Sequence, residues 1–370
     1  MKVLIIHASF GSGHKRAAQA VLEELEQRGI AAEMRDLLEF LPDPMSHFYS
    51  FAYEFMITSS RGLWRLTYNV VNAPKGPYRP AKAITQKWQF SRLKKFLKNN
   101  DFTHVIATHF TPAALLTDWR SMKELRCGIF SIITDHEAHR CWRRTGLDHY
   151  FVASSRVSSE LQQIGVPEKG ITISGIPISK AFSTSLSREE ARKSWNLPEQ
   201  AKVILVLCSA LTLKKSVQML QDFAALNTDL RYLVVAGADA AKEKRLQQKF
   251  AEDQRFTIFG FTSRIAEMMR AADLIVTKPG GLIVSESLAM GLPQILLEPI
   301  PGQEEANARF AVEAGSAICV NHKRGIYKDT LFQIISDPAK LEQMSEAARR
   351  TGRPHAAADV VGTILSRFVV

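Results

Sequence analysis

The sequence contains no pattern typical of a membrane-spanning helix or of a secretory signal. No apolar run approaches the ~18 residues that a membrane-spanning helix needs. The opening MKVLIIHASF has an apolar core of only four residues before His7, too short for a secretory signal, so we expect a first buried strand there. The four cysteines, Cys127, Cys141, Cys208 and Cys319, show no paired or metal-like spacing, which favours a reducing cytosol.

Acidic residues are missing from one long window. Between Phe55 and Asn100 there is no Asp or Glu, and residues 44–72 are dense in aromatic side chains. The window holds ten basic residues: Arg61, Arg65, Lys75, Arg79, Lys82, Lys87, Arg92, Lys94, Lys95 and Lys98. Aromatic residues and cations without acids are typical of a surface that lies on anionic lipid. A core helix followed by a solvated basic helix would give the same pattern, whereas no stacking motif or recognition helix points to nucleic acid.

The net charge of +11 is uneven along the chain. Residues 1–180 carry 24 Lys and Arg against 16 Asp and Glu, and residues 181–370 carry 24 against 21. The excess in the N-terminal half predicts an anionic surface or partner for that half.

Short apolar runs alternate with helical patterns, which predicts an α/β fold with parallel sheets in two domains. In the N-terminal half the expected strands are Lys2–Ala8, Phe102–Ala107, Gly128–Ile133, His149–Ser154 and Gly170–Ser174. In the C-terminal half they are Val203–Cys208, Tyr232–Ala236, Phe256–Phe259, Leu274–Val276, Gln294–Leu297 and Ala317–Val320.

The stretch from Thr277 to Gly315 contains the strongest pattern. Lys278-Pro279-Gly280-Gly281 follows a buried strand and precedes an expected helix, Leu282 to Met290. A helix start presents unpaired N–H groups, and two glycines let its backbone approach a phosphate closely. Glu286, one and a half turns into the helix, could reach a ribose. Gln303, Glu304 and Asn307 follow on one helical face. A tight turn with no ligand would have the same glycines.

This segment resembles the donor-binding region of the monogalactosyldiacylglycerol synthase and processive diacylglycerol glucosyltransferase family (family 28). The match rests on TKPGG, on Glu286 five residues after Gly281, and on PGQEEAN. It extends to Gly11-Ser12-Gly13-His14 and to the segment with Asp135, His139 and Trp142. The resemblance implies a GT-B fold, two Rossmann-like domains facing across a cleft. It also implies a glycosyltransferase that moves a hexose from a UDP-sugar to diacylglycerol or a glycosylated diacylglycerol with inversion.

The resemblance assigns the acceptor chemistry to the N-terminal half. His14 is the expected base, with Asp135 and His139 as further candidates, although His14 could also simply cap its helix. The family often has a polar or acidic residue before this turn. Here that position is Ser9, which leaves open whether a carboxylate partners His14. His136 and His139 are three apart rather than four, so we expect no zinc motif.

Donor contacts are expected from the C-terminal half, through Gly237, Gly260, Phe261, Lys278, Gly280, Gly281, Glu286, Gln303, Glu304 and Asn307. Phe261 could equally belong to the core, and Ser209 stands where related enzymes usually have glycine. The chain has no Asp-x-Asp pair, the usual metal-binding feature of metal-dependent transferases. We therefore expect no metal and no cofactor, with the diphosphate held by backbone N–H groups and Lys278.

The expected domains are residues 1–178, which bind acceptor and membrane, and residues 179–354, which bind the UDP-sugar. In the family GIPI, here residues 175–178, leads into the second domain, and the helix in 355–370 crosses back. The expected location is the cytoplasm, peripherally on the cytoplasmic face of the cell membrane, with no nucleic-acid partner. Three alternatives stay open: a UDP-GlcNAc-using transferase to another lipid, a UDP-sugar epimerase, and a non-enzymatic UDP-sugar sensor.

Overall fold

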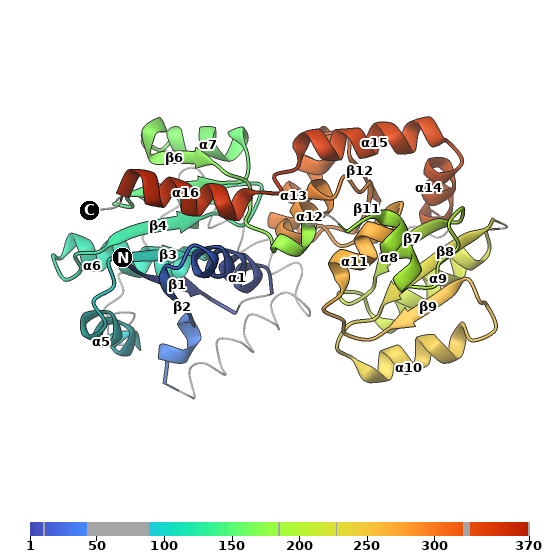
Figure 1. The fold of residues 1–370 in the computed structure, drawn as a ribbon, viewed down its shortest axis with the longest axis horizontal. Helices are drawn as coiled ribbons and strands as arrows, with labels where there is room; N and C mark the ends of the chain where they lie inside the picture. The colour runs from blue at the N-terminus through green and yellow to red at the C-terminus, as the bar shows by residue number, and fades with distance from the viewer. Residues whose placement is uncertain are drawn as a thin grey trace. The chain divides into compact units, whose positions relative to one another are not determined.

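Two parallel sheets organise the molecule. The computed structural model describes residues 1–9, 12–42, 89–144, 146–183, 186–226, 228–320 and 326–368. One compact unit comprises residues 1–179, 300–306 and 355–370, and the other comprises 180–299 and 307–354. Each unit contains a six-stranded parallel sheet with helices packed on it (Figure 1). The predicted α/β class with two parallel sheets is confirmed.

The first sheet has the strand order β2-β1-β3-β4-β5-β6, so the order reverses between β1 and β3. Its strands are β1 (Lys2–His7), β2 (Ala31–Asp36), β3 (His104–Ala107), β4 (Gly128–Ile132), β5 (His149–Val152) and β6 (Ile171–Ile173). The helices of this unit include α1 (Ser12–Gln27), α5 (Ser91–Asn99), α6 (Phe110–Ser121), α7 (Ser155–Gln162) and α16 (Ala356–Phe368). Open parallel sheets bind ligands at the carboxyl ends of their strands, beside such a reversal.

Alternation along β1 builds a core on each face of the first sheet. Leu4 and Ile6 pack in the cluster under α5 and α6, and Val3 and Ile5 pack in the cluster under α1 and α16. This follows from the two-residue period of a strand that is buried on both sides. Figure 1 shows α16 beside α1, where Arg28 also donates to the carbonyl oxygen of Ala358 at 3.2 Å.

The second sheet has the order β12-β11-β10-β7-β8-β9, with its reversal between β7 and β10. Its strands are β7 (Lys202–Leu207), β8 (Leu230–Val235), β9 (Phe256–Phe259), β10 (Leu274–Thr277), β11 (Gln294–Leu297) and β12 (Ala317–Val320). Its helices are α8 (Arg188–Ser194), α9 (Leu213–Ala224), α10 (Ala240–Lys249), α11 (Ile265–Ala271), α12 (Gly281–Ala289), α13 (Gln303–Glu313), α14 (Ile326–Ile335) and α15 (Pro338–Thr351). The α13 helix begins in residues assigned to the first unit.

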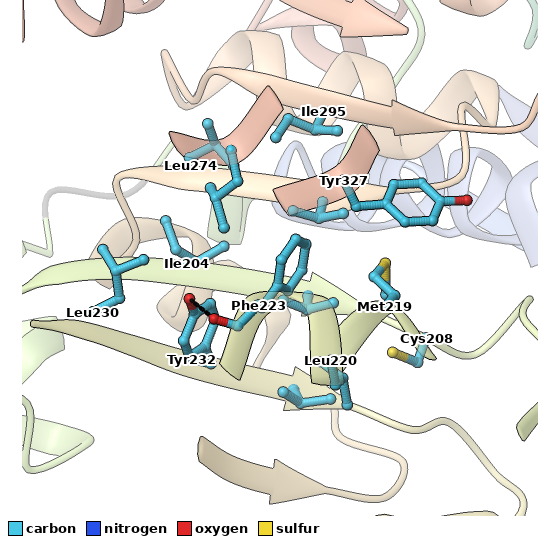
Figure 2. Packing of buried hydrophobic residues seen from close by; sticks show 14 of the residues in the cluster. Ile204, Cys208, Met219, Leu220, Phe223, Leu230, Tyr232, Leu274, Ile295 and Tyr327 are labelled. Atoms are coloured by element: carbon cyan, nitrogen blue, oxygen red, sulfur yellow. Dashed lines mark hydrogen bonds between the residues drawn. The ribbon is translucent and has the colours of Figure 1, made fainter. Parts of the chain in front are cut away.

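Aromatic and aliphatic side chains fill one face of the second sheet (Figure 2). The rings of Phe223 and Tyr232 stack with their centroids 5.8 Å apart. The buried hydroxyl of Tyr232 donates to the carbonyl oxygen of Phe223 at 3.3 Å, which satisfies its polar group inside the core. The opposite face is covered by α12, α13 and α15 through Val284, Leu288, Ala308, Ala311 and Ala348.

Apolar runs in the sequence predicted every strand of the two sheets except β2. All the side chains of β2 remain half-buried or exposed, and its sequence AAEMRD lacks the apolar run of a buried strand. The expected aromatic surface at 44–72, and the basic residues from Arg61 to Lys87, lie outside the described residues. The described part of the basic window begins at residue 89 and contains α5.

Candidate active site

His14 lies where the first sheet reverses its strand order. The structure begins α1 at Ser12, three residues before the expected helix start at Lys15, so His14 belongs to the first helical turn. The preceding strand β1 pairs in parallel with β3, and Thr108 follows β3 directly. The carboxyl ends of two neighbouring strands therefore bring Thr108 to His14.

Two hydrogen-bond partners fix the His14 ring. Its Nδ1 lies 2.9 Å from the carbonyl oxygen of Thr108 and 2.7 Å from the hydroxyl oxygen of Thr134, the second residue after β4. A carbonyl oxygen only accepts, so Nδ1 carries the hydrogen and Nε2 of the neutral ring carries the lone pair. Neither of these two partners is a carboxylate. The backbone N–H of Ser9 instead donates to Asp36 at 3.3 Å.

The surroundings of His14 keep its imidazole neutral. Burial lowers its pKa to about 4, against a smaller opposing effect of the Thr108 carbonyl, and His7 lowers it further. Desolvation penalises the charged form of a histidine. At neutral pH the Nε2 atom is therefore unprotonated and able to accept a proton.

A group of rings packs around His14. The His109 ring meets it edge-on with centroids 4.7 Å apart, and the Trp142 ring lies 6.4 Å away. Phe110 contacts both His109 and His139, with centroids 4.0 and 5.3 Å apart. Burial lowers the pKa of His139 to about 3 and that of His109 well below its usual value. The cluster therefore holds three neutral imidazoles.

His109 has the opposite tautomer to His14. As the N-cap of α6, its Nδ1 accepts from the backbone N–H of Thr111 at 3.2 Å. The hydrogen of the neutral ring is therefore on Nε2. Thr108, His109 and Thr134 were not predicted from the sequence as site residues. Their position within two residues of the ends of β3 and β4, at the carboxyl edge of the sheet, is the signal that could have found them.

Asp135 is buried in the first unit and accepts a hydrogen bond from the side-chain amide of Gln303 at 3.0 Å. The carboxylate of Glu304 accepts from the backbone N–H of Ile300 at 2.7 Å, inside the loop that leads to α13. The structure thus brings Gln303 to Asp135 and ties Glu304 to its own loop. Asn307 is 1 % exposed.

The glycine turn before α12 has room for a methyl group at Gly280. Gly280 is the N-cap of α12 with φ of −66° and no side-chain cap, so the fold does not require glycine for its conformation. A Cβ atom added there would meet only a side-chain carbon of Ile283 at 3.8 Å, an ordinary contact. The absence of a side chain leaves room for one carbon atom beside the N–H groups at the start of α12, whose first residue is Gly281.

Two charged residues of this region are buried. Lys278 is 7 % exposed, and its ammonium donates to the carbonyl oxygen of Glu298. Glu286 is 1 % exposed in the second turn of α12. The sequence predicted both as donor ligands, and the structure places them within one β-α unit, between β10 and β11.

The turns after β8 and β9 carry the remaining expected donor residues. Gly237 has φ of +94°, and an added Cβ would lie 2.7 Å from Cβ of Ser209, so only glycine fits there. An added Cβ at Gly260 would meet the Glu243 carboxylate at 2.2 Å. Phe261 is 80 % exposed, so the interpretation that it belongs to the core is wrong.

Among the described residues, no group of three or more His, Cys, Asp or Glu side chains could hold a metal ion. Within the same ranges, each helix is too short or too polar to span a bilayer. The α5 helix exposes Arg92, Lys95 and Lys98, while Lys94 pairs with Glu124 at 2.6 Å.

Known proteins resemble this chain along its whole length. Residues 14–178 match the family model of monogalactosyldiacylglycerol (MGDG) synthase, and residues 187–351 match that of glycosyl transferases group 1. A processive diacylglycerol beta-glucosyltransferase of Bacillus pumilus is 27% identical over 99% of this chain and 95% of its own. Its counterpart from Bacillus cereus is 29% identical over 99% of this chain and 93% of its own.

Solved structures with low sequence identity share the fold. MurG of Acinetobacter baumannii has a TM-score of 0.64 at 17% identity, covering 99% of both chains. The S. aureus MnaA–UDP co-structure has a TM-score of 0.67 at 14% identity, covering 100% of this chain and 98% of that one. These likenesses confirm the GT-B fold class. With the sequence relatives, they show that the chain is a glycosyltransferase similar to monogalactosyldiacylglycerol synthases and processive diacylglycerol glucosyltransferases.

Proposed function

We propose that this glycosyltransferase moves a hexose from UDP-glucose or UDP-galactose to diacylglycerol, or to a glycosylated diacylglycerol, with inversion and without a metal ion. The acceptor class is supported by the names of the sequence relatives, which are processive diacylglycerol beta-glucosyltransferases. UDP-glucose carries its sugar in α linkage, so a β-linked product would require inversion at the anomeric carbon.

The observation that carries the proposal is the orientation of His14. Its Nδ1–H is held by the Thr108 carbonyl, so Nε2 offers a lone pair at the carboxyl edge of the first sheet. In the proposed step the acceptor hydroxyl gives its proton to Nε2 as its oxygen bonds to the anomeric carbon. The bond from that carbon to the β-phosphate oxygen breaks, and its electron pair leaves on UDP. Asp135 and His139 are further candidates for contact with the acceptor.

Leaving UDP gains negative charge, which the start of α12 would stabilise. The space beside Gly280 and the N–H groups from Gly281 onward suit a diphosphate. Lys278 would add a cation to the same turn. Glu286 would bind the ribose, and Gln303, Glu304 and Asn307 would bind the sugar hydroxyls. Gly237, Gly260 and the exposed Phe261 would contact the nucleotide.

The proposed place of reaction is the cytoplasmic face of the membrane, with the enzyme bound peripherally. The exposed cations of α5 support this, since each cation near anionic headgroups contributes ~1 kcal/mol to binding. A diacylglycerol acceptor is itself confined to the bilayer. An enzyme held at the surface would therefore meet it without extracting it first.

The decisive experiment supplies each UDP-sugar with diacylglycerol vesicles and identifies the lipid products by mass spectrometry. A hexosyl-diacylglycerol formed equally with and without EDTA is the expected result. Turnover of a UDP-sugar without acceptor would instead indicate an epimerase or hydrolase. Transfer only from UDP-GlcNAc, or only to other extracted lipids, would revise the substrates. UDP-sugar binding with no turnover on any acceptor would indicate a sensor.

A further inference from the structure

Glu298 has a backbone conformation that its residue type disfavours. It follows β11 directly with φ of +31°, in the left-handed region where a side chain meets its own backbone. Four non-glycine residues in the described ranges have positive φ, and of these only Glu298 is buried. Its conformation persists only because the surrounding structure holds it.

Three contacts hold Glu298 in place. One carboxylate oxygen pairs with the ammonium of Lys215 on α9, and the other accepts from the hydroxyl of Tyr327 on α14 at 2.8 Å. The backbone N–H donates to Val320 of β12 at 3.0 Å. The ring of Tyr327 packs in the core, with its hydroxyl turned away from Leu230 and Leu274 (Figure 2).

The carbonyl group of Glu298 faces the glycine turn. Its oxygen accepts a hydrogen bond from the ammonium of Lys278, the residue two before Gly280. The anchored carboxylate and the strained backbone of Glu298 therefore act together to hold the position of a buried cation next to the start of α12.

We infer that Glu298 is a positioning residue for donor binding, acting through Lys278. This inference rests on the proposed function, in which the turn before α12 receives the UDP diphosphate. A cation already held at that turn loses less conformational entropy when the anion binds than one on a free side chain. Glu298 would thus raise the affinity for UDP without touching it.

The test is a double-mutant cycle on UDP binding, measured by titration calorimetry on the full chain. Glu298→Gln keeps the side-chain shape and loses the ion pair, so UDP affinity should fall about tenfold. Lys278→Met should lose at least as much. The double variant should bind UDP no more weakly than Lys278→Met alone, because Glu298 acts only through that lysine. Glu342→Gln, which removes an exposed pair with Arg349, is the matched control and should bind as wild type.

Tyr327→Phe supplies a milder variant should Glu298→Gln fail to fold. It removes one hydroxyl, keeps the ring in the core, and should weaken UDP binding about threefold, again without effect in a Lys278→Met background. The inference would be overturned, with the proposed function intact, if either substitution lowered UDP affinity further in the Lys278→Met background. It would also be overturned if Glu298→Gln bound UDP as wild type does. A wild-type chain that fails to bind UDP would overturn the proposed function as well.

Discussion

The Nδ1 atom of His14 lies 2.9 Å from the carbonyl oxygen of Thr108, and the Thr108 hydroxyl donates back to the His14 carbonyl oxygen at 3.0 Å. This reciprocal pair joins the first turn of α1 to the residue after β3. The imidazole is therefore oriented by the backbone, in a role that a carboxylate often fills in other active sites. Because the backbone is set by the sheet, this part of the orientation depends on the fold, and the Thr134 hydroxyl at 2.7 Å adds one side-chain contact.

Replacing His14 should remove catalysis and keep donor binding. In His14→Gln the lone pair on Nε2 is lost, and kcat should fall by about 10² to 10⁴, the usual contribution of a general base. UDP affinity, measured by calorimetry, should stay within about twofold of wild type, because the expected UDP ligands lie elsewhere. Thr134→Val, which removes one contact to Nδ1, should give a smaller loss of kcat. Unchanged turnover in His14→Gln would exclude His14 from the mechanism.

The neutral imidazoles should make the folded state sensitive to acid. The pKa values of His14 and His139 are lowered to about 4 and about 3, mainly by burial, from 6.5 in the unfolded chain. Between these values the unfolded chain binds more protons, so stability falls as the pH drops below 6.5. Urea unfolding should give a lower free energy of unfolding at pH 4.5 than at pH 7. His139→Gln should reduce that difference, and an equal pH dependence in this variant would contradict the assignment.

The sequence predicted secondary structure wherever the pattern of buried residues lies within one short segment. Apolar runs such as Val203 to Leu207 mark parallel strands, because both faces of such strands are covered. Strand β2 was not predicted because its side chains stay partly exposed at the sheet edge. The contacts of Thr108 and Thr134 with His14 depend on which strands are neighbours in the sheet. No single segment of the sequence determines that strand order.

The exposure of single side chains and the strain of the backbone could likewise not be predicted from the sequence. From the sequence, Phe261 could be either a core residue or a ligand contact. The structure shows that it is 80 % exposed, so it does not belong to the core. Glu298 carries no sequence signal, because its positive φ follows from contacts to α9, α14 and β12. The sequence therefore marked the turns that follow the buried strands, but not the residues that support those turns.

Two glycine substitutions should separate binding from folding. Gly280→Ala adds a methyl group where the protein leaves room, so the chain should remain folded, with at most ~1 kcal/mol lost at the N-cap. The methyl group would occupy the proposed phosphate space and weaken UDP binding about tenfold or more. Gly237→Ala serves as the contrast. It forces φ of +94° on alanine against Ser209, so the melting temperature itself should drop. Unaltered UDP affinity in Gly280→Ala would place the diphosphate elsewhere.

The exposed cations of α5 should bind the enzyme to anionic membranes. Leu93 and Leu97 are buried, whereas Arg92, Lys95 and Lys98 are exposed, so the three can be changed to Gln without disturbing the core. At ~1 kcal/mol for each cation, the triple variant should bind vesicles of mixed anionic and zwitterionic phospholipid on the order of a hundredfold more weakly. Added salt should weaken wild-type binding more than binding of the variant.

The matched control removes the same number of positive charges from another helix. Lys244, Arg245 and Lys249 are exposed on α10, and their replacement by Gln removes three cations from the second unit. Co-sedimentation should show this control variant bound nearly as tightly as wild type if the α5 surface faces the lipid. Equal losses in the two triple variants would mean that overall charge, and not the α5 surface, governs membrane binding. No loss in the α5 variant would remove that helix from the membrane contact.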